Sequence, residues 1–171
     1  MSDFTIQPAD FSRDGDRVVA RFHLTLDNHV EEVWAALTQS DRLPQWLAPG
    51  EIEPRVGGAA RMDFGDSGIV IESQVTAFEA PRLLEYSWSG PCEPLRPVRW
   101  EIEPLGAGCI LTLTLATLAT DDPDRAAAGW AAHLEMLAAS LAGVPIHFPY
   151  QLFKAARETY GAQVMALAEA A

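Results

Sequence analysis

The sequence predicts an α+β fold in which a curved antiparallel sheet of six to seven strands wraps around a long C-terminal helix. Large apolar side chains alternate with polar ones over residues 84–88, 98–102 and 111–115, which is the period of half-buried strands. Residues 130–141 then carry apolar side chains at three-to-four spacing, which is the period of a helix. A chain of 171 residues with 49% hydrophobic content is long enough to bury one such core.

The N-terminal half predicts one strand, two short helices and three further strands. Residues 18–26 alternate as a half-buried strand does. A short helix follows, for which Asn28 is the expected N-cap and Glu31 can reach back to it. A second short helix is expected at residues 43–47, where Pro44 limits it to a turn or two. Glycine-rich breaks then separate strands over residues 51–56, 60–64 and 69–78.

The C-terminal half predicts three strands and two helices. A strand runs from Pro81 through Trp88, a proline-rich loop covers residues 90–97, and residues 98–103 and 109–117 form a hairpin. The acidic segment at residues 121–124 favours a helix start, and Gly143 favours its end after Leu141.

A last segment, from Tyr150 to about Ala168, has helical spacing of its apolar residues. We therefore divide the chain into a domain over residues 1–144 and a helical extension over residues 145–171. The extension packs either on this domain or on a second subunit, so a homodimer through the C-terminal helix is the alternative.

Composition excludes several classes of protein. The formal charge of −12, from 24 acidic and 12 basic residues, disfavours binding to nucleic acid and to anionic membranes. No stretch is apolar and long enough for membrane insertion, and the first sixteen residues lack the pattern of a secretory signal. Cys92 and Cys109 are isolated and read as reduced thiols, so we expect a cytoplasmic protein. The histidines form no metal-binding pattern, and we expect no metal and no cofactor.

The strand phase predicts what lines the space between sheet and helix. Charged residues such as Glu85, Arg99 and Glu101 fall on the outer phase, where they can pair across strands. Tryptophans gather on the inner phase, which is typical of an apolar ligand pocket but also of a solid core. The expected lining is Trp46, Phe64, Ile71, Ser73, Tyr86, Trp88, Trp100, Leu113, Trp130, His133, Leu134 and Leu137.

Three polar side chains in this set could orient a ligand. His133 lies one helical turn from Trp130, and it could act as a base, orient a ligand or simply bond to backbone or water. Tyr86 could donate to a ligand carbonyl or satisfy its hydroxyl within the core, and Ser73 is the third candidate. No catalytic motif accompanies them, so we expect no catalytic residue.

Several local motifs resemble a known family. The order of elements is similar to the helix-grip fold of lipid-transfer START domains and the birch-pollen allergen. The motifs resemble the activator of heat-shock-protein-90 ATPase-like family of the SRPBCC superfamily, whose members are mostly bacterial, and the resemblance covers residues 18–143. They are Val33-Trp34-Ala35-Ala36-Leu37-Thr38, Gln45-Trp46-Leu47, Gly57-Gly58, Arg82-Leu83-Leu84-Glu85-Tyr86-Ser87-Trp88, Gly108 with Leu111-Thr112-Leu113-Thr114, and Gly129-Trp130.

The residues and the resemblance together favour a protein that binds a small hydrophobic or aromatic molecule between sheet and helix. Two alternatives stay open. One is an enzyme similar to the cyclases, aromatases or hydrolases of the superfamily, with His133 or Tyr86 as acid or base. The other is an interaction protein, such as a chaperone regulator or a homodimer built through the C-terminal helix.

Overall fold

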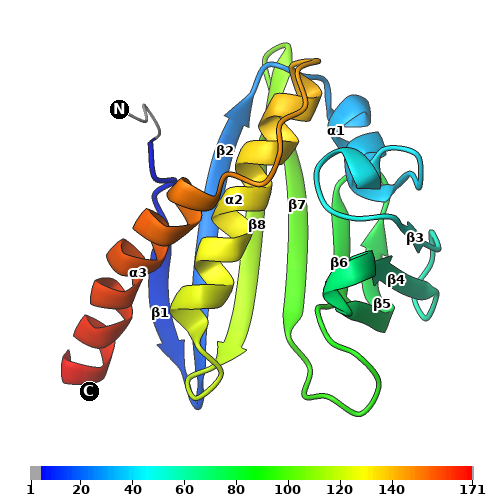
Figure 1. The fold of residues 1–171 in the computed structure, drawn as a ribbon. Helices are drawn as coiled ribbons and strands as arrows, with labels where there is room; N and C mark the ends of the chain where they lie inside the picture. Colours follow the sequence, from blue (N-terminus) through cyan, green and yellow to red (C-terminus); the bar gives the residue numbers. More distant parts are fainter. Residues whose placement is uncertain (1–4, 171) are drawn as a thin grey trace.

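The structure is a computed structural model that describes residues 5–170, apart from the side chains of Asp66 and Ala170. Residues 1–4 and 171, at the ends of the two predicted units, lie outside the described residues. The α+β fold is confirmed, since one antiparallel sheet curves around the long helix α2 (Pro123–Leu141) (Figure 1). Within the described residues the sheet has eight strands, in the order β1-β2-β8-β7-β6-β5-β4-β3. They are β1 (Asp10–Asp14), β2 (Arg17–Leu26), β3 (Gly50–Ile52), β4 (Ala59–Asp63), β5 (Val70–Glu79), β6 (Leu83–Ser87), β7 (Pro97–Leu105) and β8 (Gly108–Leu118).

The expected count of six to seven strands is wrong, because β1 adds an edge strand that pairs with β2. Phe11 is the one large apolar residue of β1, and four of its five residues are exposed. An edge strand of this composition shows no alternation of apolar and polar residues, so its sequence carries no strand signal.

The two faces of the sheet divide as the alternation predicts. Trp100 of β7 and Leu113 of β8 are register partners on the inner face, and both are buried. On the outer face, Arg99 of β7 lies 3.1 Å from Glu85 of β6, which confirms an expected cross-strand ion pair, and 3.4 Å from Glu101 of its own strand. The apolar side chains therefore face α2, and the charged ones face solvent.

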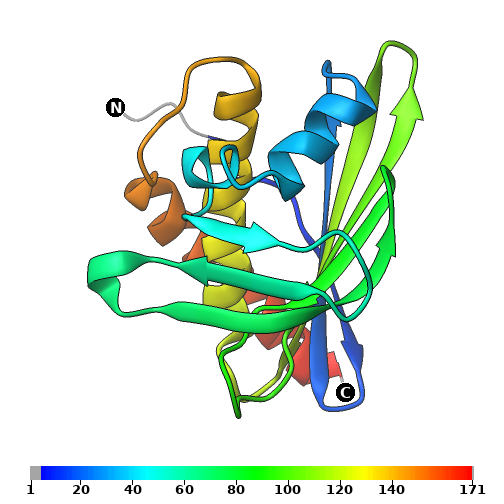
Figure 2. The ribbon, with the colours of Figure 1, turned by 90° about the vertical axis from the view of Figure 1, so that its right-hand side faces the viewer.

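The sheet bends sharply within β5. The register of β5 against β6 shifts between Val75 and Ala77. Such a bulge bends the strand that carries it and increases its twist. Figure 2 shows β3, β4 and β5 turned across β2 and β8, so that this part of the sheet approaches α2 from the side. This bend positions the wall of the cleft described below.

Two short helices follow β2 as expected: α1 (Val30–Thr38) and the 3-10 helix η1 (Leu43–Gln45). A further 3-10 turn, η2 (Gly65–Ser67), joins β4 to β5. The expected N-cap of α1 is wrong, because His29 occupies that position without a side-chain cap bond. The side-chain amide of Asn28 donates instead to the Leu141 carbonyl at 3.2 Å. It thus satisfies one of the carbonyl groups that the end of α2 leaves without a helical partner.

The C-terminal helix α3 (Tyr150–Ala170) packs on α2 and β1 of its own domain (Figure 1). Ala156 and Tyr160 are buried at this contact. The Tyr160 ring lies 5.4 Å from that of Phe11 and 6.0 Å from that of Phe22, between ring centroids. Its hydroxyl donates to the Gln7 carbonyl, so the helix is tied to the segment that precedes β1.

Candidate functional site

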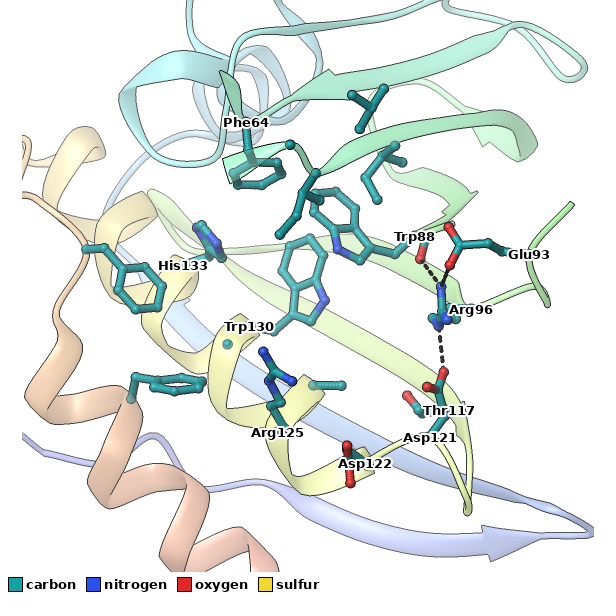
Figure 3. A pocket seen from close by; sticks show the side chains of 18 residues that line it. Phe64, Trp88, Glu93, Arg96, Thr117, Asp121, Asp122, Arg125, Trp130 and His133 are labelled. Carbon is teal, nitrogen blue, oxygen red and sulfur yellow. Dashed lines mark hydrogen bonds and ion pairs between the residues drawn. The ribbon is translucent and has the colours of Figure 1, made fainter. Parts of the chain in front are cut away.

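A cleft of about 770 Å³ opens between α2 and the bent part of the sheet. The loop between β6 and β7, the segment between α2 and α3, and the first turn of α3 also contribute to its lining. A volume of this size is typical of small-molecule sites. Figure 3 shows the side chains that line it. Its apolar members include Phe64, Ile69, Val70, Ile71, Trp88, Trp130, Phe148 and Phe153, and its polar members include Glu93, Arg96, Thr117, Asp121, Asp122, Arg125 and His133.

Edge-to-face contacts join the aromatic wall of the cleft to the core. The Trp88 ring lies 5.8 Å from Phe64 and 4.8 Å from Trp130, between ring centroids. Trp130 in turn lies 5.7 Å from Trp100, which lies 5.7 Å from Trp46. Such contacts fix the ring orientations beyond what burial alone would do. The wall is therefore preorganised.

His133 presents one ring nitrogen to the cleft. Its Nδ1 lies 3.0 Å from the Trp46 carbonyl oxygen, which can only accept, so Nδ1 carries the proton in the neutral ring. Burial lowers the pKa of His133 below its usual value, and this hydrogen bond offsets only part of the change. At neutral pH Nε2 is therefore an unprotonated acceptor.

Nε2 of His133 has no hydrogen-bond partner among the described residues. None of the described side chains has a fully buried nitrogen or oxygen without a partner, so Nε2 keeps contact with solvent. Figure 3 shows the His133 ring beside Phe64 and Trp130 in the cleft. The arrangement can accept one hydrogen bond from a bound molecule.

The other end of the cleft is polar and centres on Arg96. Its Nε donates to Asp121 at 2.6 Å and its Nη1 donates to Glu93 at 3.2 Å. The backbone N–H of Gly90 also donates to Glu93, and these bonds lower the pKa of that carboxyl group. Arg125, from the first turns of α2, is exposed at this end and has no ion pair with any described residue.

The structure brings five of the twelve expected lining residues together in the cleft. They are Phe64, Ile71, Trp88, Trp130 and His133. Of the others, Trp46, Tyr86, Trp100, Leu113, Leu134 and Leu137 are buried beneath the cleft and at most 1% exposed. The space between the centre of the sheet and α2 is thus filled by side chains, and the cleft lies beside it.

The polar groups expected in the pocket are partly used inside the protein. The Trp46 indole donates to the Ala36 carbonyl at 2.7 Å, and the Trp100 indole donates to the Tyr86 hydroxyl at 3.3 Å. Burial raises the pKa of Tyr86 well above its usual value, so its hydroxyl stays protonated. Ser73 donates to the Ser87 carbonyl at 2.6 Å and does not line the cleft.

Sequence reasoning missed the polar end of the cleft and its aromatic rim. Arg96 lies in a proline-rich loop and Phe148 in the segment between helices, and neither segment has a periodicity that indicates where it folds. The sequence did contain one indication of the cleft. Arg125, Gly129 and His133 recur at a spacing of four and so share one face of the helix.

The part of the chain that the structure describes contains neither clustered metal ligands nor a helix that could span a membrane. No group of three histidine, cysteine, aspartate or glutamate side chains converges there as metal ligands do. None of the described helices combines the length and apolar character that a membrane span requires.

Solved structures share the fold. CalU16 from Micromonospora echinospora matches with a TM-score of 0.79 and 22% identity over 94% of this chain and 99% of that chain. DynU16, from the dynemicin biosynthetic locus, matches with a TM-score of 0.63 and 28% identity over 77% of this chain and 49% of its own. The Aha1 dimer from Colwellia psychrerythraea matches with a TM-score of 0.61 and 19% identity over 71% of this chain and 93% of that chain.

The family model described as Activator of Hsp90 ATPase homolog 1-like protein matches residues 27–142, from just before α1 to the end of α2. No curated protein sequence matches this chain. The matched residues contain the motifs on which the resemblance was based, and they cover well over half of the chain. The chain therefore belongs to the Activator of Hsp90 ATPase homolog 1-like protein family and has its helix-grip fold.

Proposed function

We propose that this protein binds a small, mainly hydrophobic or aromatic molecule in the cleft between the sheet and α2. One observation carries the proposal: Trp88 and Trp130 form a wall of a cleft of about 770 Å³, while the core behind them is closed. Apolar walls with a few convergent polar groups are typical of small-molecule sites. Phe64, Ile71 and His133 would complete the contact, and the buried residues Trp46 and Trp100 would support it from behind.

The similarity to DynU16 also supports a small-molecule ligand, because that protein comes from a biosynthetic locus. The fold alone does not specify a function, since one fold serves many. The proposal therefore depends on the cleft of this chain, and the chemistry of its lining is what the experiments address.

We propose binding rather than catalysis as the role of this cleft. Nδ1 of His133 is bonded to a backbone carbonyl, whereas a catalytic histidine is normally oriented by a carboxylate. The Tyr86 hydroxyl accepts from Trp100 in the core and does not reach the cleft. A His133→Ala variant that abolishes turnover of a bound molecule, with an unchanged melting temperature, would instead support the enzyme alternative.

Binding can be tested with a panel of lipids, terpenoids and aromatic metabolites. Tryptophan fluorescence detects binders, and calorimetry gives their affinities. We expect Trp88→Leu to weaken a binder by at least about tenfold, which corresponds to about 1.4 kcal/mol of lost contact. Trp34→Leu is the matched control, because Trp34 is half-buried against Phe78 and does not line the cleft. If no molecule binds, or if both variants bind equally well, the proposal is wrong.

A homodimer through the C-terminal helix is a separate proposal. The dimer of the Colwellia psychrerythraea protein supports dimerisation as such, and the choice of helix is ours. Because α3 buries Ala156 and Tyr160 on its own domain, such a dimer would use the outer side of α3, where Tyr150 and Met165 are exposed. Sedimentation of the full chain tests it. A dimer that Met165→Glu dissociates supports the proposal, and a monomer at all concentrations refutes it.

We also propose that the protein works in the cytoplasm. Its two cysteines, Cys92 and Cys109, are free thiols, which is the usual state in a reducing compartment. Fractionation of the host cell, followed by immunodetection of the protein, tests this location.

A further inference from the structure

Gly129 lies inside α2 at the floor of the cleft, where a glycine brings no packing benefit to the free protein. Glycine is unfavourable inside a helix compared with alanine. A Cβ atom added here would meet no described heavy atom within 4 Å outside its own helical surroundings. No neighbouring side chain therefore needs the space that this glycine leaves open.

The space left open at Gly129 lies between two polar side chains on one face of α2. Arg125 and His133 are four residues before and after Gly129, and all three line the cleft. At a rise of about 1.5 Å per residue, eight residues span about 12 Å along the helix axis. That length fits a flat two-ring or three-ring molecule lying along the helix, with its face on the backbone at Gly129 and its edge against Trp130.

His133 determines which polar group such a molecule should carry. Its Nε2 is an acceptor without a protein partner among the described residues, so it is matched by a donor such as a hydroxyl group and not by an ether or a carbonyl.

The charged side chains at the other end of the cleft indicate whether the ligand itself carries a charge. Two guanidinium groups, those of Arg96 and Arg125, lie at this end beside three carboxylates. The formal charge of these five groups is −1, and the formal net charge of the whole chain is −12. Arg96 is already paired with two of these carboxylates. The net negative charge of these groups, within a strongly acidic protein, disfavours an anionic ligand. The three carboxylates belong to Glu93, Asp121 and Asp122.

We infer that the ligand is an uncharged, flat aromatic molecule with a hydroxyl group, lying across Gly129 with its hydroxyl donating to His133 Nε2. This inference rests on the proposed function and adds the chemical class of the ligand and its place on α2.

Three matched probes test the chemical class: 2-naphthol, 2-methoxynaphthalene, which lacks the donor, and 6-hydroxy-2-naphthoate, which adds a negative charge. We expect 2-naphthol to bind about tenfold more tightly than either of the others, because an unpaired acceptor or a repelled charge weakens binding. His133→Phe keeps an aromatic ring without the acceptor, and it should remove the preference over 2-methoxynaphthalene. Equal binding of the three probes would overturn the inference.

Two glycine variants test the position of the ligand. Gly129→Ala should raise the Tm by about 2–4 °C through helix propensity, and should weaken 2-naphthol binding by about fivefold or more. Gly161→Ala is the matched control, because Gly161 lies inside α3 outside the cleft and its added Cβ would make an ordinary contact at 3.5 Å with Asp124. It should raise the Tm and leave the affinity unchanged.

The outcomes separate the two proposals. If wild-type protein binds members of the wider panel but Gly129→Ala binds as tightly, or if its Tm falls, the inference fails and the proposed function stands. The inference also fails alone if panel molecules bind and 2-naphthol does not. If neither the panel nor the naphthalene series binds, the proposed function fails as well.

Discussion

Replacing Tyr160 by alanine should destabilise the whole domain, because α3 is part of its core. Tyr160 is 1% exposed, packs against the rings of Phe11 and Phe22, and donates its hydroxyl to the Gln7 carbonyl. Removal of a large aromatic side chain from such a site costs about 3–5 kcal/mol. The substitution also leaves the Gln7 carbonyl without its hydrogen-bond donor, so we expect the free energy of unfolding to fall by an amount in the upper half of that range.

Urea unfolding followed by circular dichroism measures this loss, and hydrogen exchange of the α3 amides shows whether the helix detaches first. Tyr150→Ala is the matched control, because Tyr150 lies on the same helix but is 59% exposed. We expect it to change the free energy of unfolding by less than about 0.5 kcal/mol. Equal and small effects of the two variants would refute the docking of α3 on its own domain. They would also remove Phe153 from the wall of the cleft.

Three further predictions concern titration, reactivity and the polar end of the cleft. Because burial lowers the pKa of His133, the unfolded chain takes up a proton first as the pH falls through about 6.5. The free energy of unfolding should therefore fall by up to about 1.4 kcal/mol per pH unit below that point, and a His133→Phe variant with the same pH dependence would contradict this. A thiol reagent should label the exposed Cys92 in the native protein and the buried Cys109 only after denaturation, since burial also raises the pKa of the Cys109 thiol. Arg96→Gln removes two ion pairs, so it should cost about 1 kcal/mol and speed hydrogen exchange in the loop between β6 and β7; unchanged exchange would show that the pairs do not hold this loop.

The local pattern of the chain was sufficient for most of the fold. Alternation places Trp100 and Leu113 on the inner face and Arg99 on the outer face, because a pleated strand turns every second side chain to the same side. Proline at the start of α2 and Gly143 after its end, at φ +81°, mark the ends of the long helix. Such signals act over a few residues and need no knowledge of the rest of the molecule.

The other features of the fold depend on contacts between residues that are far apart in the chain. Asn28 looks like a helix cap in sequence, but the end of α2 comes within its reach and offers a carbonyl. The strand β1 forms because β2 supplies a partner for its backbone, whereas the side chains of β1 carry no pattern that indicates a strand.

The cleft also depended on the tertiary structure. Strand phase tells which side of the sheet a tryptophan faces, but not how deep it lies, so Trp100 in the core and Trp88 in the cleft look alike in sequence. Depth is set by the bulge in β5, which bends the sheet, and by the loops that bring Arg96 and Phe148 to the same opening. The sequence by itself determined the alternation, the turns and the helix ends, because these depend on backbone geometry over a few residues. Only the tertiary structure separated a filled core from an open cleft, because that difference depends on how distant segments pack together.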